Sequence, residues 1–320
     1  MKSKGIMALG GGTLKNAIWL ATSACVLVMG APAMAQNAST VTQDGSDSQV
    51  DVTQTGSGNE STVTQEVGST FNFATITQDG TDAISTLTQG STGGATQTNS
   101  VTVSQSGNGA ESIISQDGNN RLEVVVTQIG DSFSQVTQSG RINRIEVLQD
   151  GDSNSSTVTQ SNRRNFTGNT QDMDDNGVIQ IGNSNISTVT QTGRRKSVFL
   201  IQNGDGNDSS ITQTVNGGGG NRSVVTIDQL ANGGVSVVNQ AAIDSFVDLM
   251  QTDVSNSSTV TQSGEDQDAD ILQSGTNSTS VIDQSGLNNF SDIIQSGDFD
   301  FSDVTQGGTN NTATVSQNGG

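Results

Sequence analysis

Apolar and polar residues alternate over short stretches of this chain, and the alternation returns at a fixed spacing. Residues 149–160 read QDGDSNSSTVTQ, and residues 180–191 and 306–317 repeat the same pattern. From Asn154 to Gln160 every second side chain falls on one side, which is the period of a β-strand, and Thr and Val suit a strand. The residues before Asn154 are turn-formers, among them Gly151, which adopts positive φ at no steric cost. Each unit is therefore predicted to be one short strand with one tight arc.

The closing glutamine recurs every eleven residues, and from Gln229 to Gln317 it does so without interruption. Aligned on that glutamine, the chain has 25 units, and the residue two places earlier is aliphatic in 24 of them, Asn169 being the exception. A column this uniform is expected to point into a core. Its predicted members include Val63, Val158, Val189, Ile211, Val260, Ile271, Ile282, Val304 and Val315.

A second rhythm appears four places before the glutamine, where large and small residues alternate, as in Val101, Ser112, Val124 and Ser134. The true period is therefore two units, or 22 residues, so that one coil contains two unlike strands. This predicts an all-β fold, a two-sheet parallel β-solenoid of 11-residue strand-arc units. Each strand would stack on the strand one coil away at the amyloid-like cross-β spacing of about 4.8 Å.

Glutamine and asparagine occupy fixed columns of the unit, where stacked copies would form amide ladders between coils. We interpret these ladders as structural. The best-matched members are Gln54, Asn59, Gln65, Gln149, Asn154, Gln160, Gln180, Asn185, Gln191, Gln202, Asn207, Gln213, Gln306, Asn311 and Gln317.

The first 35 residues do not follow the repeat. Lysines precede an apolar run at 17–28, and residues 33–35 form a small-x-small site, so residues 1–35 are predicted to be a secretory signal peptide cleaved after Ala35. The repeats then divide into a block at 36–160, an irregular coil at 161–177 and a second block at 178–320. Residues 90–97 and 214–222 lengthen two arcs and are expected to be loops.

Composition limits the possible functions. Residues 36–320 contain neither Cys nor Pro, and nine basic residues stand against 32 acidic ones, a net charge of −23. Nucleic-acid binding needs a basic face, so it is not expected, and no stable membrane insertion is expected either. Without His, Cys or Tyr in this part, an enzyme is not expected. Residues 150–154 and 205–208 faintly resemble calcium loops, but turn chemistry explains them, and neither metal nor cofactor is predicted.

No cap is visible at either end of the repeats. A bare terminal coil exposes unpaired backbone N–H and C=O groups, so we expect the two ends to be templates for end-to-end growth. The expected partner is therefore the chain itself.

The unit Q-x-G-x-x-N-x-(A/S)-x-x-x-Q resembles the curlin repeat of bacterial curli fibres. Gln306, Gly308, Asn311, Ala313 and Gln317 match every position, and other units match with Ser for Ala. The resemblance implies a secreted functional-amyloid subunit, major or minor, that self-assembles into extracellular cell-surface fibres for biofilm matrix and cell adhesion. It also implies a curli-type outer-membrane secretion pore and a nucleator subunit as partners. The chain has more repeats than curlin subunits usually carry, and it lacks their pore-addressing segment.

Two other functions remain open. Outward Thr-x-Thr pairs, such as Thr157/Thr159 and Thr188/Thr190, resemble the flat arrays of insect ice-binding solenoids, although Thr also suits any exposed strand. A surface adhesin that never polymerises is the third hypothesis. Arg163, Arg164 and residues 194–196 are predicted to lie in turns, either as gatekeepers against runaway stacking or as solvated residues.

Overall fold

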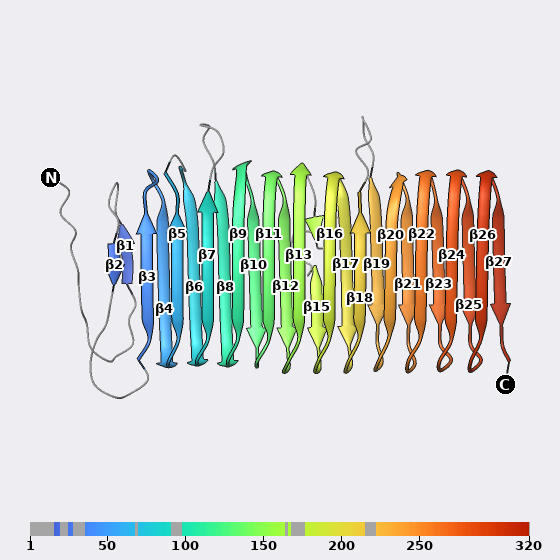
Figure 1. The fold of residues 1–320 in the computed structure, drawn as a ribbon, viewed down its shortest axis with the longest axis horizontal. Coiled ribbons are helices and arrows are strands. Elements are labelled where there is room, and N and C mark those ends of the chain that lie inside the picture. Colours follow the sequence, from blue (N-terminus) through green and yellow to red (C-terminus); the bar gives the residue numbers. More distant parts are fainter. Residues whose placement is uncertain are drawn as a thin grey trace. The chain divides into compact units, whose positions relative to one another are not determined.

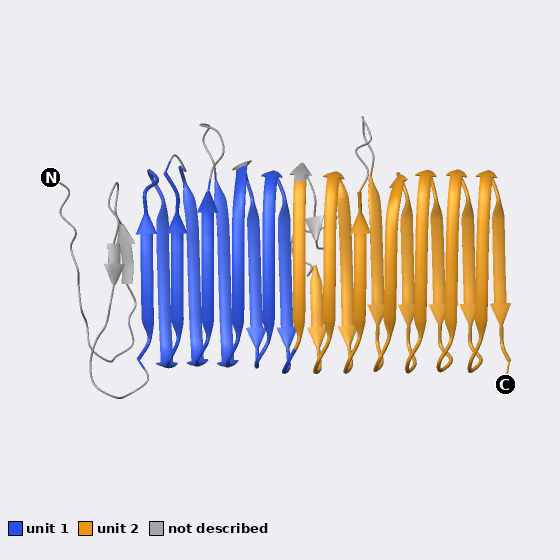
Figure 2. Ribbon diagram, in the orientation of Figure 1, with its two compact units in different colours: residues 1–153 blue, residues 154–320 orange. Residues whose placement is uncertain are grey.

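A computed structural model describes residues 16–19, 25–27, 36–67, 70–90, 98–163, 166–167, 177–214 and 222–319. The chain forms two compact units, Met1–Ser153 and Asn154–Gly320 (Figure 2). None of the described residues is helical, and nearly all of them belong to strands or short arcs (Figure 1). Ala35, the predicted cleavage site, lies outside the described residues.

Unit 1 contains strands β1 to β12, which form two sheets. The A sheet of unit 1 consists of β3, β5, β7, β9 and β11, and its B sheet consists of β4, β6, β8, β10 and β12. The bounds are β1 Asn16–Trp19, β2 Cys25–Leu27, β3 Ala38–Gln43, β4 Gln49–Ser57, β5 Glu60–Gln65, β6 Asn72–Thr81, β7 Ile84–Gly90, β8 Asn99–Asn108, β9 Glu111–Asn120, β10 Glu123–Ile129, β11 Phe133–Arg141 and β12 Arg144–Asp150.

Unit 2 repeats this arrangement with strands β13 to β27. Its A sheet consists of β13, β16, β18, β20, β22, β24 and β26; in its B sheet β14 and β15 both pair with β17, followed by β19, β21, β23, β25 and β27. The bounds are β13 Ser155–Arg163, β14 Phe166–Thr167, β15 Val178–Ile181, β16 Ile186–Arg194, β17 Lys196–Asn203, β18 Asp208–Gln213, β19 Ser223–Gln229, β20 Val235–Ile243, β21 Phe246–Gln251, β22 Ser257–Glu265, β23 Asp268–Gln273, β24 Thr279–Leu287, β25 Phe290–Gln295, β26 Phe301–Thr309 and β27 Thr312–Gln317.

Each unit is a β-solenoid of two parallel sheets, so the predicted fold class is confirmed. Consecutive strands of the chain alternate between the sheets, and each stacks in parallel on the strand one coil away. In unit 2 the register places Gln262 on Gln284 and Gln284 on Gln306, 22 residues apart. The two exceptions are β1 and β2 in the predicted signal peptide, which pair antiparallel with β4 and β3.

The ladder glutamines stay in register although their spacing along the chain varies, because the extra residues lie in one kind of arc. Glutamines more than 12 residues apart are joined by arcs that lead from an A strand to a B strand, as between Gln65 and Gln78 or Gln213 and Gln229. The predicted irregular coil at 161–177 is such a connection. β14 and β15 are two pieces of one pass through the B sheet, which explains why the alternation of strand types loses phase there. Residues 91–97, 164–165, 168–176 and 215–221, with Asn169, lie outside the described residues.

The aliphatic column lies between the two sheets of each unit. The members named above are all buried except Val315, which is partly exposed because it lies on β27, the last strand of the B sheet; Val52 on β4 is also partly exposed. The strict large/small alternation is wrong at Ala269 and Ser291, where the B sheet has a small residue as well.

The arcs of successive coils stack as closely as the strands do. This close approach explains why glycine occurs so often in the arcs. Gly264 has φ +105, and a Cβ added to it would lie 2.0 Å from the carbonyl oxygen of Gly286 in the next coil. Only glycine permits both this conformation and this approach of two backbones.

We predict that Gly264→Ala lowers the free energy of unfolding by more than about 1 kcal/mol, because the new methyl group meets backbone that cannot move aside. Gly206→Ala is the matched control, since Gly206 also has positive φ (+69) but nothing lies within 4 Å of its added Cβ. Urea denaturation monitored by circular dichroism measures both. Equal losses in the two variants would show that stacking of the arcs does not limit the turn.

Candidate functional site

The most regular side-chain feature of each unit is a continuous ladder of buried glutamines along each sheet. In the A sheet of unit 1, Nε2 of Gln43, Gln65, Gln89 and Gln116 donates in turn to Oε1 of the glutamine one coil further on, at 2.8–3.0 Å. The B sheet of unit 2 has the same series from Gln180 to Gln317, at 2.8–3.0 Å. Every one of these bonds runs in the same sense, from the earlier coil to the later one.

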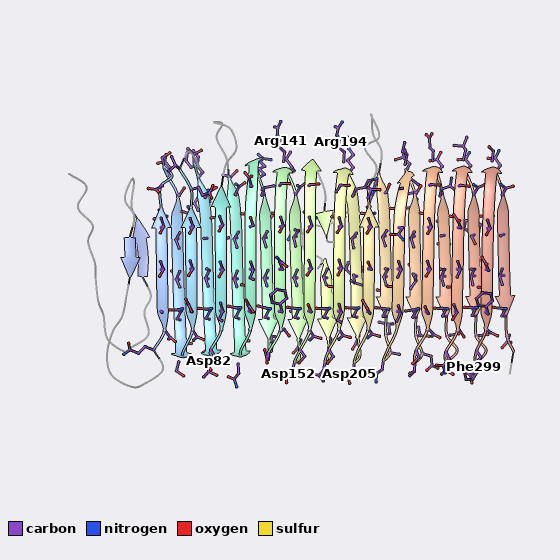
Figure 3. The ribbon with its side chains drawn as sticks, in the orientation of Figure 1. Asp82, Arg141, Asp152, Arg194, Asp205 and Phe299 are labelled. Atoms are coloured by element: carbon purple, nitrogen blue, oxygen red, sulfur yellow. The ribbon has the colours of Figure 1, made fainter. Side chains whose placement is uncertain are left out.

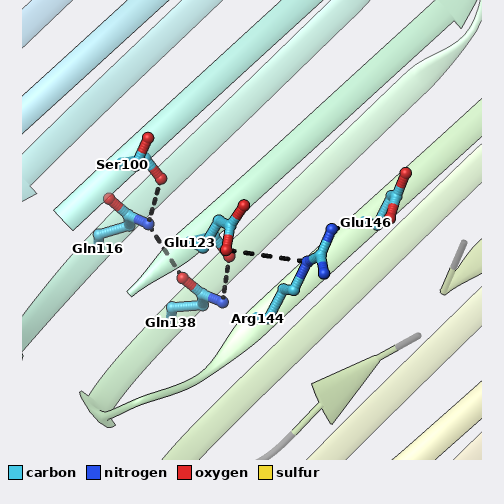
Figure 4. A network of polar contacts seen from close by, with 6 residues as sticks. All are labelled: Ser100, Gln116, Glu123, Gln138, Arg144 and Glu146. Carbon is cyan, nitrogen blue, oxygen red and sulfur yellow. Dashed lines mark hydrogen bonds and ion pairs between the residues drawn. The ribbon is translucent and has the colours of Figure 1, made fainter. Parts of the chain in front are cut away.

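A second bond of the same amide ties the two sheets together. The other hydrogen of Nε2 reaches a backbone carbonyl at the start of the preceding strand, as from Gln262 to Phe246 at 2.9 Å and from Gln284 to Asp268 at 2.9 Å. Figure 4 shows one such junction in unit 1, where Gln116 bonds both Gln138 and the carbonyl of Ser100. The sequence predicted stacking of the glutamines but did not reveal this tie between sheets, which depends on how strands of unlike sheets face each other.

The asparagine column closes the corners of the coils. Oδ1 of Asn185 accepts the backbone N–H of Asn207 at 3.0 Å, and its Nδ2 donates to the carbonyl of Gly204 at 2.7 Å. Asn185 thus satisfies backbone groups that the arc would otherwise leave unpaired, whereas the side chain of Asn72 in the same column has no hydrogen-bond partner within the described part of the chain.

The predicted ladder residues occupy these positions in both units. Gln54, Gln65 and Gln149 line the ladders of unit 1, with Asn59 at a corner. In unit 2 the ladder glutamines are Gln160, Gln180, Gln191, Gln202, Gln213, Gln306 and Gln317, and the corner asparagines are Asn154, Asn185, Asn207 and Asn311. All are buried except Asn311 and Gln317, which belong to the last coil and are partly exposed.

Comparison with protein families matches this ladder to a known repeat. Residues 45–80, which run from the first A-to-B arc through the glutamine of β6, match the family model described as the curlin associated repeat. This segment of the chain is similar to the curlin repeat. The resemblance seen in the sequence is therefore confirmed. Comparison with curated proteins gives no match.

Buried serines of the small column bond one another in pairs. In the A sheet of unit 2, Ser187 donates to Ser156 at 3.0 Å and Ser280 donates to Ser258 at 2.9 Å, with all four side chains buried. The pattern of large and small residues predicted only that this column fills space. The preference for Ser over Ala along the A strands was the signal that could have revealed the paired hydroxyls.

One of the residues predicted to lie in a turn is inside the solenoid, and that prediction was wrong. Lys196 begins β17 in the column that asparagine usually occupies, is buried, and donates from Nζ to Ser223 Oγ at 2.9 Å. Burial lowers the pKa of Lys196 to about 8, although the charge of Asp244 opposes this shift. The repeat register, rather than charge, decides which side of the strand this residue faces.

The outer face of the B sheet in unit 2 carries a column of aspartates. Asp248, Asp270 and Asp292 stand in register on β21, β23 and β25. Burial, followed by the charges of Asp268, Asp248 and Asp292, raises the pKa of Asp270 to about 6. Stacking at the spacing of a β-sheet therefore brings like charges together, and this opposes the stacking of these coils at neutral pH.

The structure offers little for catalysis or metal binding. In the described part of the chain, no group of three or more His, Cys, Asp or Glu side chains could hold a metal ion. Both loops that faintly resemble calcium sites are arcs whose aspartates bond the backbone of a neighbouring coil, as Asp205 does with the N–H of Asn183 at 2.7 Å. Among the described residues, no helix is long and apolar enough to cross a membrane.

We predict that Gln116→Leu strongly destabilises unit 1. The change leaves Nε2 of Gln89 and Oε1 of Gln138 without their buried partners, at a cost of about 1–3 kcal/mol for each unsatisfied group. Gln135→Leu is the matched control, because Gln135 is exposed on the neighbouring strand β11. Chemical denaturation compares the two variants. A loss for Gln116→Leu no larger than that of the control would mean that the ladder does not stabilise the fold.

We predict that the free energy of unfolding rises as the pH falls from 7 through about 6, because Asp270 becomes protonated over this range. The folded chain binds this proton below about pH 6, whereas an unfolded aspartate binds it only near pH 3.9. Asp270→Asn should therefore be more stable than the wild type at pH 7, and the difference should shrink towards pH 4. Urea midpoints measured across this range test the prediction.

Asp298→Asn provides a control of opposite sign. Bonds from the backbone and side chain of Thr276 lower the pKa of Asp298, so its charge stabilises the fold above the unfolded pKa. This variant should be less stable than the wild type at pH 7. If both variants shifted stability in the same direction, local electrostatics would not be the cause.

Proposed function

We propose that this curlin-repeat chain is a secreted structural protein that assembles with copies of itself into extracellular amyloid-like fibres of the curli type, which serve biofilm matrix and cell adhesion. The predicted signal peptide supports export, and a curli-type pore and a nucleator would be its partners in secretion and assembly. The observation that carries the proposal is the polarity of the glutamine ladders. Because every bond runs in one sense, the two ends of a ladder are complementary rather than alike.

At the end of unit 2 formed by β26 and β27, the last glutamine of each ladder has an Nε2 group with no further glutamine to donate to among the described residues. Gln317 Nε2 bonds the carbonyl of Phe301 at 2.8 Å, but no described glutamine lies beyond it. Val315 beside it is partly exposed, and the outer edges of β26 and β27 have no partner strand among the described residues. This terminal coil could therefore donate hydrogen bonds to a further coil.

At the start of unit 1 the ladders begin with Gln43 and Gln54, which donate to Gln65 and Gln78, and no described glutamine precedes them. Cleavage after Ala35 would remove β1 and β2, the strands that pair with β4 and β3. The first coil would then present glutamine Oε1 acceptors and two free strand edges.

The two coils also match in side-chain type. Stacking β26 of one copy on β3 of the next places Ser302 on Ser39, Val304 on Val41, and Gln306 on Gln43. These are the same pairs that stack within a unit, as Ser280 on Ser302 and Gln284 on Gln306. Growth would therefore continue the internal repeat without a new kind of contact.

The ice-binding alternative depends on outward threonines in register. Thr40/Thr42, Thr62/Thr64 and Thr86/Thr88 stack on β3, β5 and β7. The array is interrupted on β9 by Ile113 and Ser115, and further positions on β20 and β24 also lack threonine. Because a flat, continuous array is needed to match a crystal surface, the fibre is the better-supported function. A surface adhesin that does not polymerise is the third candidate.

We predict that purified residues 36–320 convert after a lag into fibres that bind thioflavin T and give the cross-β reflections near 4.8 and ~10 Å. The conversion should be faster with added salt, because salt screens the repulsion that the strongly negative net charge produces. Val315→Asp should slow elongation at least several-fold, since it places a charge in the new contact. Thr314→Asp, on the exposed side of the same strand, should not. A folded monomer that persists under these conditions would contradict the proposal, and thermal hysteresis without fibres would favour ice binding.

A further inference from the structure

Within each unit, the described basic residues lie in one kind of arc. Every described Lys and Arg of residues 36–320 lies in, or directly beside, an arc that leads from an A strand to a B strand; these are Arg121, Arg141, Arg144, Arg163, Arg194, Arg195, Lys196 and Arg222. The arcs that lead from a B strand back to an A strand contain none. Arg121 and Arg141 in unit 1 are exposed, and Arg194 and Arg195 in unit 2 are partly exposed. We call these arginines the Arg edge of their unit.

The opposite edge carries aspartates and no basic residue, and acidic residues such as Asp244 and Asp266 also lie in A-to-B arcs. Asp82, Asp131 and Asp152 lie in B-to-A arcs of unit 1, and Asp205, Asp253 and Asp298 lie in those of unit 2. We call this series the Asp edge. Figure 3 shows the separation within each unit: Arg141 projects from one edge of unit 1 and Asp82 and Asp152 from the other, while Arg194 and Asp205 project from opposite edges of unit 2.

Arginines and aspartates on opposite edges also belong to the same coils. In unit 1, the coil β9–β10 has Arg121 on one edge and Asp131 on the other, and the coil β11–β12 has Arg141 and Asp152. In unit 2, the coil β16–β17 has Arg194 and Arg195 on one edge and Asp205 on the other. A copy placed alongside, without any axial shift, would therefore bring each arginine opposite an aspartate.

The arginines are available for such a contact. Arg121 and Arg141 are exposed, and Arg194 and Arg195 are partly exposed. In the described part of the chain, none of these four forms an ion pair, whereas Arg144 pairs with Glu123 at 3.8 Å and with Glu146 at 3.5 Å (Figure 4). The arginines of the Arg edge therefore keep their charge uncompensated in the isolated chain.

The aspartates are held in place by their own coils. Oδ1 of Asp152 accepts the backbone N–H of Asp131 at 3.0 Å, and Oδ1 of Asp205 accepts that of Asn183 at 2.7 Å. These bonds fix the carboxylates at the edge without neutralising them. An arginine fork is suited to such a fixed carboxylate.

We propose that the Arg edge of one copy docks side by side on the Asp edge of a second copy, coil against coil. The contact joins unlike surfaces, so it is heterologous and can repeat, and it would gather fibres into flat bundles. In its application to fibres the inference rests on the proposed function. Single exposed ion pairs are weak and screened by salt, but a fibre repeats them in every subunit, so the lateral contact gains strength from multivalency.

The test compares bundle width by electron microscopy at about 0.1 M ionic strength. Charges more than roughly 10 Å apart are screened at this ionic strength, so only charges in direct contact at the edges attract one another. The variant with Arg121, Arg141, Arg194 and Arg195 all changed to Gln is expected to give single fibres where the wild type gives bundles. The matched control has the same change in net charge on the sheet faces, through Thr77→Glu, Thr137→Glu, Thr188→Glu and Thr305→Glu, all at exposed positions. It should still bundle.

A charge exchange makes the test specific. One variant has the four arginines changed to Glu, so that both of its edges are acidic; a second has Asp131, Asp152 and Asp205 changed to Arg, so that both are basic. Each alone is expected to stay unbundled, and a mixture of fibres of the two should bundle again. If the second variant does not fold, Asp→Asn at the same positions keeps the Oδ1 acceptor, removes the charge and should abolish bundling.

The outcomes separate this inference from the proposed function. Fibres that bundle equally in all variants, or a mixture that stays unbundled, would overturn the lateral contact and leave fibre formation intact. If bundling is unchanged but added polyuronate co-sediments with the fibres through the arginines, the Arg edge meets an anionic polymer instead, which also overturns the proposal. If no fibres form, sedimentation equilibrium should show side-by-side dimers of the wild type that the Arg→Gln variant lacks.

Discussion

The buried glutamine amide is the constraint on which each unit depends. A carboxamide removed from water must have its hydrogen bonds satisfied, and the interior of a thin solenoid offers few partners. The chain solves this by stacking identical amides, so that Gln65 accepts from Gln43, donates to Gln89, and uses its second hydrogen for a carbonyl of the other sheet. An amide in a single coil would lack its neighbours, and for that reason the coil is stable only within a stack.

This constraint explains where the sequence is free to vary. The ladders fix the register of every strand, because a slip of one residue would turn glutamine and valine outwards. Glutamines spaced more widely than 12 residues are always separated by a passage from an A strand to a B strand, as between Gln89 and Gln105. The strands are therefore uniform, while in each unit the A-to-B connections carry most of the variation in length and all of the described basic residues.

The same contacts connect folding with the proposed assembly. The glutamine ladders that hold the coils together end in groups that can bond further. Nε2 of Gln317 in the last coil is a donor, and Oε1 of Gln43 and of Gln54 in the first coil are acceptors for the ladders of a second copy. Acidic columns such as Asp248, Asp270 and Asp292 oppose this stacking through like-charge repulsion. The proposed assembly would balance hydrogen bonds along the axis, which are directional and short-ranged, against charge repulsion that salt and pH modulate.

The sequence by itself determined the strand, the 22-residue coil, the two-sheet parallel solenoid and the aliphatic and amide columns, because each follows from a period that a single chain displays. It could not determine the bond between a glutamine and the opposite sheet, the paired serine hydroxyls, or the burial of Lys196, because these depend on which strands face each other in space. Periodicity places a residue on one face of its strand, but only the stacked structure decides which neighbours complete its hydrogen bonds. The restriction of the described basic residues to A-to-B arcs likewise became visible only when each arc had been assigned to the two strands that it joins.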